Sequence, residues 1–283
     1  MAESKVWLVT GSSSGFGRSM TEFLLKNGNK VVATLRRIEA LSDLAKQYPS
    51  SQLLIVQMDV VKSSEVTTAF AKAKEVFGGV DVVFNNAGTS IVGEVESMSD
   101  QDARQMFEVN FWGVSNVTRE AIRTFREVNK PTGGRLLQVS STLGLVGRPA
   151  MSYYSASKHA LEGFSESIAQ ELDPAWNIKV TILEPGPFRT RMFEDSMQPS
   201  PQHPAYANPE LGGSKFRKWL ASAVADGDTE KAVVVIEKVT HLDEPPLRLP
   251  LHRGTVKAVR DKAKNLTDTM DTYESWTENV YFT

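Results

Sequence analysis

The chain has 283 residues, of which 41% are hydrophobic and 23% charged, and a formal net charge of −2. This length suits one α/β domain, or at most two small ones. The near-neutral charge gives no electrostatic reason to expect nucleic acid or a membrane as partner. The absence of cysteine excludes disulfides, thiol nucleophiles and thiolate metal sites. No run approaches the ~20 apolar residues of a membrane span, and the N-terminus lacks a signal-peptide pattern, so we expect a cytoplasmic protein.

Short apolar runs alternate with segments of helical pattern along the first two thirds of the chain. The expected strands are Val6–Val9, Lys30–Leu35, Leu53–Met58, Val80–Phe84, Arg135–Val139 and Ile178–Leu183. The expected helices are Phe16–Lys26, Ile38–Gln47, Ser63–Phe77, Asp100–Val128 and Ser152–Leu172. Most strands are apolar on both faces, as in a sheet covered by helices on both sides. The alternation predicts an α/β fold with a doubly wound parallel sheet.

A glycine-rich loop, Thr10–Gly17, lies between the first expected strand and the following helix. Its glycines, at positions 11, 15 and 17, permit a tight turn and let a pyrophosphate approach backbone N–H groups at the helix N-terminus. Such a loop alone is often only a turn. Its place inside a βαβ unit of about thirty residues is what a dinucleotide-binding fingerprint requires, and this favours nucleotide binding.

The second expected strand ends at Leu35, which Arg36 and Arg37 follow. In dinucleotide-binding folds an acidic residue ~20 residues beyond the glycines holds the ribose 2′-hydroxyl of NAD. This chain has no acid there, and a guanidinium suits the 2′-phosphate of NADP because it binds phosphate as a bidentate fork. Two solvated arginines at a strand end are the alternative, but the missing acid favours NADP.

Polar residues close three further strands and interrupt one helix. Asp59 and Val60 follow the third strand, and Asn85–Gly88 and Ser140–Ser141 end the fourth and fifth. Asn110 lies inside a long expected helix, where an amide is unusual without a partner. The strand ends share the edge at which such sheets bind ligands. Taken singly, each residue has the plainer interpretation of a polar strand end or an internally bonded asparagine.

Tyr154 and Lys158 are four residues apart at the start of an expected helix, so they share one face. An ammonium within reach favours the phenolate and lowers a tyrosine pKa from its usual ~10. Such a tyrosine gives or takes a proton near neutrality, as general acid–base catalysis requires. One chance pair on a surface helix would be unsurprising, so the pair alone is weak evidence.

Together these motifs resemble the short-chain dehydrogenase/reductase family, in its single-domain branch with a Thr-Gly-xxx-Gly-x-Gly loop. The matching residues span about residues 5–191 and are Thr10–Gly17, Asp59, Asn85–Gly88, Asn110, Ser141, Tyr154, Lys158 and Pro185–Thr190. Ser141 precedes Tyr154 by thirteen residues, the usual family interval, and only Tyr154, not Tyr153, has a lysine four residues later. The resemblance implies a Rossmann sheet of strand order 3-2-1-4-5-6-7 with helices on both faces.

The resemblance also implies the catalytic roles. Tyr154 would be the acid/base on a carbonyl or alcohol oxygen, and Ser141 would hydrogen-bond that oxygen. Lys158 would lower the pKa of the tyrosine and bind the nicotinamide ribose, and Asn110 would hold a water in a proton relay. The implied cofactor is NADP, with Ser13 joining the arginine on the 2′-phosphate. Its implied contacts are Gly11, Ser13, Ser14, Gly15, Phe16, Gly17, Arg36, Arg37, Asp59, Val60, Asn86, Ala87, Gly88, Tyr154, Lys158, Pro185, Gly186, Phe188 and Thr190.

The last third of the chain is less regular. The proline-rich segment Arg191–Pro209 would be the substrate lid by resemblance, within a lid region 188–225, although plain packing explains its apolar residues equally well. Asp226–Val239 predicts a helix, and Pro245–Leu251 a final edge strand, where prolines are tolerated. This last stretch, like the Thr-Leu-Arg after the second strand, resembles the 17β-hydroxysteroid dehydrogenase-like subgroup.

A C-terminal extension, 252–283, follows the final strand and includes an expected helix, Thr255–Leu266. We expect it to serve packing or oligomer contacts. Ala156, Ala160, Gly163 and Ser167 form a small-residue helix face that predicts a homodimer, unless this face packs on its own sheet. None of the four histidines is at metal-ligand spacing, so no metal is expected.

Three segments would surround the substrate: Thr89–Gly93, Thr142–Met151 and the lid. Their side chains are mainly apolar, and Arg148 is the main charge before the lid. The expected substrate is therefore a small apolar molecule with a ketone or hydroxyl at one end. The expected lining residues are Ile91, Val92, Leu143, Leu145, Val146, Met151, Met192, Phe193 and Met197.

The sequence thus predicts a single domain, 1–283, that interconverts a ketone or aldehyde and an alcohol with NADP as cofactor. One alternative is a catalytically silent NADP-binding regulator of the same fold, but such proteins typically lack the Tyr/Lys pair. The other is a sugar-nucleotide epimerase or dehydratase, which goes with a differently spaced glycine loop and a longer C-terminal domain.

Overall fold

The computed structural model describes residues 4–190 and 199–282. Within them, seven parallel strands form one sheet in the order β3-β2-β1-β4-β5-β6-β7, which confirms the predicted fold class. The strands are β1 Val6–Thr10, β2 Lys30–Leu35, β3 Leu53–Gln57, β4 Val82–Asn85, β5 Gly134–Val139, β6 Ile178–Glu184 and β7 Arg248–Pro250. β1 and β2 are buried almost throughout because helices cover both faces.

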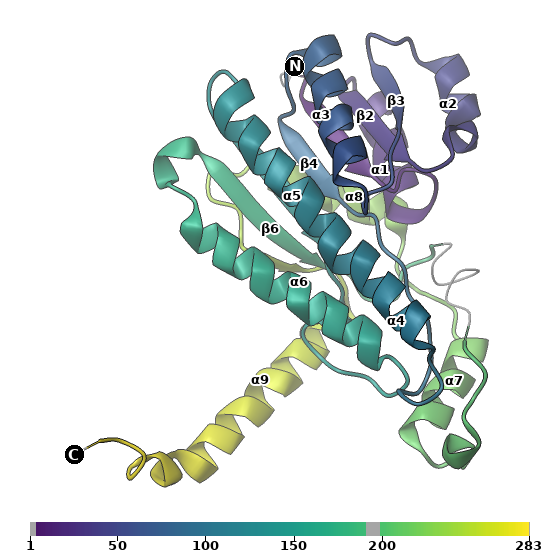
Figure 1. Ribbon diagram of the computed structural model, residues 1–283, viewed down its shortest axis with the longest axis vertical. Coiled ribbons are helices and arrows are strands. Elements are labelled where there is room, and N and C mark those ends of the chain that lie inside the picture. The colour runs from purple at the N-terminus through teal and green to yellow at the C-terminus, as the bar shows by residue number, and fades with distance from the viewer. Residues whose placement is uncertain (1–3, 191–198, 283) are drawn as a thin grey trace.

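Two apolar cores lie on opposite faces of the sheet. On one face α3 (Ser63–Phe77), α5 (Val114–Arg123) and α6 (Ser152–Glu171) pack on the strands, as Figure 1 shows. On the other, α1 (Gly15–Lys26) and α8 (Thr229–Val239) do so, and the short helix α2 (Ser42–Gln47) joins them. The crossovers therefore bring the strand ends that carry the polar motifs to one edge of the sheet.

The long expected helix Asp100–Val128 is continuous but not uniform. It begins as α4 (Asp100–Phe107), widens into a π-helical turn at Glu108–Gly113, continues as α5 and ends in a second π-helical turn at Thr124–Val128. The first wide turn contains Asn110. π-helical turns are rare and often lie at functional sites.

Two helices of the last third differ from the prediction. α7 (Gly212–Ser222) was not predicted, because its glycines and scattered apolar residues gave no clear helical pattern. α9 runs from Arg253 to Tyr273, well beyond the expected end at Leu266, and projects away from the body of the molecule (Figure 1). No helix among the described residues is long and apolar enough to cross a membrane.

Helix α6 is buried on one side and open on the other. Leu161 and Ile168 belong to the interior, whereas Ala156, Gly163 and Ser167 are exposed. A Cβ added at Gly163 would meet no atom within 4 Å. The small-residue face therefore does not pack on its own sheet, and that alternative is wrong.

Candidate active site

A cavity of about 710 Å³ lies at the carboxyl edge of the sheet. All of the predicted catalytic and cofactor-binding residues line it except Gly17 and Asn110, which lie against the lining residues Gly11 and Gly88. The predicted residues that line it are Gly11, Ser13, Ser14, Gly15, Phe16, Arg36, Arg37, Asp59, Val60, Asn86, Ala87, Gly88, Ser141, Tyr154, Lys158, Pro185, Gly186, Phe188 and Thr190. Segments distant in sequence thus converge on one space.

The glycine loop forms a backbone cradle at the N-terminus of α1. Gly15 has a φ of +53°, which side-chain-bearing residues rarely adopt. A Cβ at Gly17 would lie 2.3 Å from the carbonyl oxygen of Gly11, so only glycine lets the helix approach the loop. The first turn of α1 carries no acidic residue, and Ser14 makes no capping bond there. Exposed N–H groups and the helix dipole at this position suit a pyrophosphate.

The end of β2 presents positive charge to the same cavity. Leu35 is buried, while Arg36 and Arg37 are exposed and line the cavity. Within the described residues, neither guanidinium has a salt-bridge partner; nearby Arg18 instead pairs with Glu22 and Asp43. Two guanidiniums without a protein carboxylate are available to an anionic group of a ligand.

The loop after β4 is fixed to β1 by the Thr10 side chain. Its hydroxyl accepts hydrogen bonds from the backbone N–H groups of Asn86 (2.8 Å) and Ala87 (2.9 Å). The Asn86 amide in turn donates to the Thr10 carbonyl oxygen at 2.9 Å. Asn85 points into the core, where it donates to the Gln138 side chain at 2.9 Å. Of the two asparagines, Asn86 therefore faces the ligand space and Asn85 is structural.

Tyr154 and Ser141 meet where β5 ends and α6 begins. Tyr154 is 6% exposed, and burial raises the pKa of its phenol above the usual value, while a hydrogen bond with Ser141 opposes this in part. The Ser141 hydroxyl also accepts from the Leu143 N–H at 3.1 Å, which fixes its position. The phenol thus keeps its proton at neutral pH and is placed to donate it.

Lys158 does not lower the pKa of Tyr154 here, so this expectation is wrong for the structure described. Its Nζ lies 5.9 Å from the centre of the Tyr154 ring and donates to the Val139 carbonyl oxygen at 2.8 Å. Burial lowers the pKa of Lys158 to about 8, and the nearby Glu162 carboxylate opposes this shift. The ammonium form still predominates at neutral pH.

Asn110 has its side chain fully engaged with protein groups. Its amide nitrogen donates to the Thr89 carbonyl oxygen (2.9 Å) and to Ser157 (3.1 Å), and its oxygen accepts from the Thr89 N–H at 2.8 Å. Ser157 donates to the Tyr154 carbonyl oxygen at 2.8 Å. Asn110 therefore ties the loop after β4 to the helix that carries Tyr154, whereas its expected part in a water relay stays a prediction.

A buried charged cluster lies behind Lys158. Glu162 and Glu184 are at most 3% exposed, and both contact the guanidinium of Arg248 on β7. Burial raises the pKa of Glu162, and burial with repulsion from Glu162 raises that of Glu184 to about 7. Arg248 also pairs with the exposed Glu166 at 2.8 Å. The Arg248 guanidinium thus pairs with three carboxylates, and these ion pairs connect β7 to α6.

The substrate side of the cavity is only partly as predicted. Leu143, Met151 and Arg148 line it as expected. Val92 is fully buried and packs beneath the site with Ile91, and Leu145 and Val146 are not among the lining residues. Met192, Phe193 and Met197 lie outside the described residues.

Lining residues that were not predicted from the sequence come from α7 and from the start of α9. Phe216 and Trp219 come from α7, and Phe216 also packs against the cluster that contains Met151 and Tyr154. His252 and Thr255 come from the start of α9. An aromatic pair three residues apart at 216 and 219 was the signal for α7, since such spacing puts both rings on one helical face.

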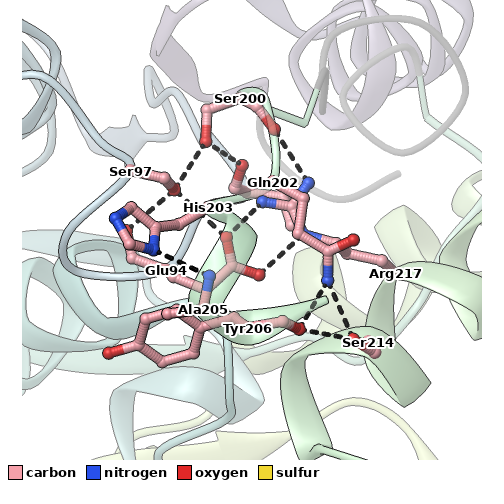
Figure 2. Close-up of polar contacts among 10 residues, drawn as sticks. Glu94, Ser97, Ser200, Gln202, His203, Ala205, Tyr206, Ser214 and Arg217 are labelled. Atoms are coloured by element: carbon pink, nitrogen blue, oxygen red, sulfur yellow. Dashed lines mark hydrogen bonds and ion pairs between the residues drawn. The ribbon is translucent and has the colours of Figure 1, made fainter. Parts of the chain in front are cut away.

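The described part of the lid region is fastened by polar contacts, shown in Figure 2. Arg217 on α7 makes a two-pronged ion pair with Glu94, at 2.8 and 2.7 Å, and donates to the Ser200 carbonyl oxygen at 2.8 Å. The Ser200 N–H donates to the Val92 carbonyl oxygen at 2.7 Å. The guanidinium holds the pKa of Glu94 at about 2. The segment following residue 198 and α7 are thereby fixed to the loop after β4.

The sequence matches the short chain dehydrogenase family over residues 5–201. The chain belongs to this family. It is 37% identical over 264 residues to an uncharacterized oxidoreductase, C162.03, of Schizosaccharomyces pombe, covering 93% of this chain and 87% of that one. It is 35% identical over 276 residues to the oxidoreductase BOA17 of Botryotinia fuckeliana, covering 97% of each. A short-chain dehydrogenase from Streptomyces avermitilis superposes with a TM-score of 0.88, at 34% identity and full coverage of both chains.

As a short-chain dehydrogenase, the protein is an oxidoreductase of a family that uses nicotinamide cofactors. The cavity fits such a group: a glycine cradle for the pyrophosphate at one end and a protonated phenol at the other. Among the described residues, no cluster of His, Asp or Glu could hold a metal ion. The buried Tyr154, which lines this cavity with Ser141, supports acid–base chemistry at its phenol.

Proposed function

We propose that this short-chain dehydrogenase is an NADP-dependent carbonyl reductase or alcohol dehydrogenase acting on an apolar small molecule. The observation that carries the proposal is the buried Tyr154, which lines one cavity together with Ser141 and the glycine cradle. A proton donor next to a cofactor cradle is what reduction of a carbonyl group requires.

Each active-site residue has a separate role in the proposed reduction of a carbonyl group. A nicotinamide cofactor in the cradle would supply the hydride. The Tyr154 phenol donates its proton to the carbonyl oxygen, and the Ser141 hydroxyl orients this oxygen and stabilises its developing charge. Lys158 lines the same cavity and would bind the nicotinamide ribose. Asn110, through Thr89 and Ser157, keeps this group aligned.

The choice of NADP rests on the end of β2. Leu35 offers no carboxylate to a ribose 2′-hydroxyl, and the guanidiniums of Arg36 and Arg37, without salt-bridge partners among the described residues, suit a 2′-phosphate. Ser13 lines the same end of the cavity and supplies a hydroxyl donor. Titration with NADPH and NADH is the direct check: tighter binding of NADH would overturn this assignment.

The apolar substrate is inferred from the other end of the cavity. Leu143, Met151, Phe216 and Trp219 line it, and Arg148 is a charge at this end. Burying apolar ligand surface there contributes about 25 cal/mol per Å² before binding costs. The resemblance to the 17β-hydroxysteroid dehydrogenase-like subgroup points in the same direction.

NADPH oxidation against a panel of ketones, aldehydes, quinones and steroids tests the proposal. We expect kcat/KM to rise with apolar size along a homologous ketone series. Preferred turnover of charged, sugar-like substrates would contradict the proposed substrate class. No turnover of any carbonyl compound, with NADPH binding intact, would favour the silent regulator.

A homodimer and a cytoplasmic location complete the proposal. The exposed small-residue face of α6 at Ala156, Gly163 and Ser167 allows close helix packing between two copies. Light scattering at micromolar concentration tests the homodimer, and a monomeric mass would reject it.

Cell fractionation tests the cytoplasmic location, and recovery of the protein with the membranes would reject it.

A further inference from the structure

Helix α9 leaves the body of the protein after its first turn. Thr255 is buried and its hydroxyl lies 2.5 Å from that of Thr142, next to the cavity. Every described residue from Arg260 onward is exposed, up to Phe282. The 21-residue helix is about 31 Å long at ~1.5 Å per residue, so most of its length extends into solvent (Figure 1). Because so little of α9 packs on the rest of the protein, contacts within the chain contribute little to the stability of this helix.

The exposed helix carries an apolar seam with the spacing of a coiled coil. Its members alternate at intervals of three and four residues, and none is charged: Val256, Val259, Ala263, Leu266, Met270 and Tyr273. An average spacing of 3.5 residues keeps such a seam facing a partner helix. Leu266, Met270 and Tyr273 are 49%, 62% and 49% exposed, so the partner is not within this chain's described residues.

The opposite face of α9 is built for solvent. Ion pairs one turn apart join Lys257 to Asp261 and Lys264 to Asp268, and all four groups are exposed. Such pairs stabilise an isolated helix by ~0.2–0.5 kcal/mol each. The polar face therefore supports the helix, while the seam is left for a partner.

Side-chain volume and charge both change along α9. The first half of the seam is small (Val256, Val259, Ala263) and the second half large (Leu266, Met270, Tyr273). The first half of the helix carries Arg253, Lys257, Arg260, Lys262 and Lys264 against the single acid Asp261. The second half, with the turn after it, carries Asp268, Asp271 and Glu274 and no basic residue. A partner that complements α9 must therefore have the reverse order of both properties.

A second copy of α9 running in the opposite direction has this reverse order. We propose that α9 pairs with α9 of a second copy of this chain in an antiparallel coiled coil, with Ala263 of each copy against Leu266 of the other. In this register Val259 meets Met270 and Val256 meets Tyr273, so small residues face large ones throughout. Glu274 of one copy comes opposite Arg253 of the other, at both ends of the contact. The two bodies lie at opposite ends of the helix pair and are related by a two-fold axis.

Two other arrangements fit the seam less well. A parallel pair would place small against small, large against large, and like charges side by side. A lipid surface would need a wide apolar face and a basic polar face, whereas this seam is narrow and the second half of the helix is acidic. The pairing is also independent of the exposed face of α6, which is on another element.

The absence of cysteine allows a direct test by disulfide trapping in the full-length protein. A mixture of V259C and M270C should form a cross-linked dimer on mild oxidation, and neither variant should do so alone. In the antiparallel pair the two copies of position 259 are eleven residues apart along the axis, about 16 Å, beyond the ~7 Å reach of a disulfide. Homodimer cross-links in the single samples would establish a parallel pair and overturn the proposal, as would the absence of any cross-link.

Two controls separate the seam from chance collision and from other contacts. In the proposed register, position 258 of one copy is level with position 271 of the other, but both lie outside the seam. A mixture of A258C and D271C should therefore not cross-link. L266D should halve the mass in light scattering, whereas N265D, which adds the same charge one residue away, should leave it unchanged. Equal masses for L266D and N265D, or equal cross-linking by both cysteine pairs, would also overturn the proposal.

Discussion

The two ends of the cavity are built in different ways. The nucleotide end is made of strand ends and backbone, with Gly15, Gly17 and Thr10 fixing the positions of N–H groups. The substrate end is made of side chains on α7, on the loop before α6 and at the start of α9. The first is held by the sheet itself, and the second by a few polar contacts such as that between Glu94 and Arg217.

Because the two ends are built differently, the cofactor that the protein binds and the substrate that it accepts depend on different parts of the structure. Backbone geometry depends on the fold, so the nucleotide end can accept the same kind of cofactor whatever lines the rest of the cavity. Side chains on α7 can change without disturbing the sheet, so the substrate end is free to vary. Variants at the two ends should therefore have separable effects on cofactor and substrate.

The largest effect is expected where the two ends meet. Tyr154→Phe should lower kcat by about 10²–10⁴-fold, because it removes the transferable proton and little else. NADPH affinity should be unchanged, as measured by fluorescence titration. Tyr153→Phe, one residue earlier and without a lysine four residues on, is the matched control and should keep its activity. Near-normal turnover by Tyr154→Phe across several substrates would refute the mechanism.

A change at the nucleotide end should alter cofactor choice alone. Leu35→Asp with Arg36→Ala removes a cation and adds a carboxylate that repels the 2′-phosphate. We expect NADPH affinity to fall about tenfold to a hundredfold, the cost of one charge-assisted contact, while KM for the carbonyl substrate stays the same. If NADH and NADPH affinities change together, Arg36 does not contact the 2′-phosphate.

A change in the fastening of α7 should alter the substrate end alone. Arg217→Met leaves the Glu94 carboxylate, 3% exposed, without its partner. Substrate KM should rise by up to about tenfold, or about 1.4 kcal/mol, with NADPH affinity unchanged. Removing both partners, in Glu94→Gln/Arg217→Met, should cost less than Arg217→Met alone, because no charge is left buried.

Because of the ion pair between Glu94 and Arg217, we expect the stability of the folded state to depend on pH in the acid range. The pKa of Glu94 is held at about 2, below the usual 4.5, so the pair stabilises the folded state fully above the usual value. This stabilisation should be lost as the pH falls from about 4.5 towards 2. In Arg217→Met that part of the acid dependence should disappear from thermal unfolding curves.

The smallest effect is expected in the cluster behind Lys158. The pKa of Glu184 is raised to about 7 from 4.5, so the folded state holds a proton that the unfolded state releases between these values. Stability should therefore fall as the pH rises through this window and then level off. Glu184→Gln should remove this fall, with a Tm gain at pH 8 of about 2–4 °C per kcal/mol recovered. Glu166→Gln, an exposed partner of the same Arg248, should not.

The nucleotide end could be predicted from sequence because it depends on local features. Thr10–Gly17 and the apolar strands are contiguous patterns, and parallel strands bring their ends to one edge whatever the side chains do. Tyr154 and Lys158 were found for the same reason, since one helical turn separates them. The pKa of Tyr154 was predicted in the wrong direction, because the burial that raises it depends on the packed structure, and the Lys158 Nζ donates to the Val139 carbonyl oxygen.

The substrate end could not be predicted in the same way. α7 is placed by an ion pair between residues 123 positions apart, and nothing local to Glu94 or Arg217 signals it. Thr255 reaches the cavity only because β7 joins the sheet beside β6 and returns the chain to this edge. Both depend on contacts that form after the sheet is assembled.

The π-helical turn at Glu108–Gly113 has a consequence for tolerance to insertions and deletions. Because a wide turn holds one residue more than an α-helical turn, the two halves of the long helix are out of phase by roughly 100°. Loss of a single residue there would leave a regular α-helix, so the protein could still fold. It would rotate one half against the other, and either Asn110 would turn away from Thr89 and Ser157 or α5 would present the wrong face to the sheet. The extra residue therefore sets the rotation of one half of the helix relative to the other. It lets Asn110 face the active site while α5 presents its apolar face to the core.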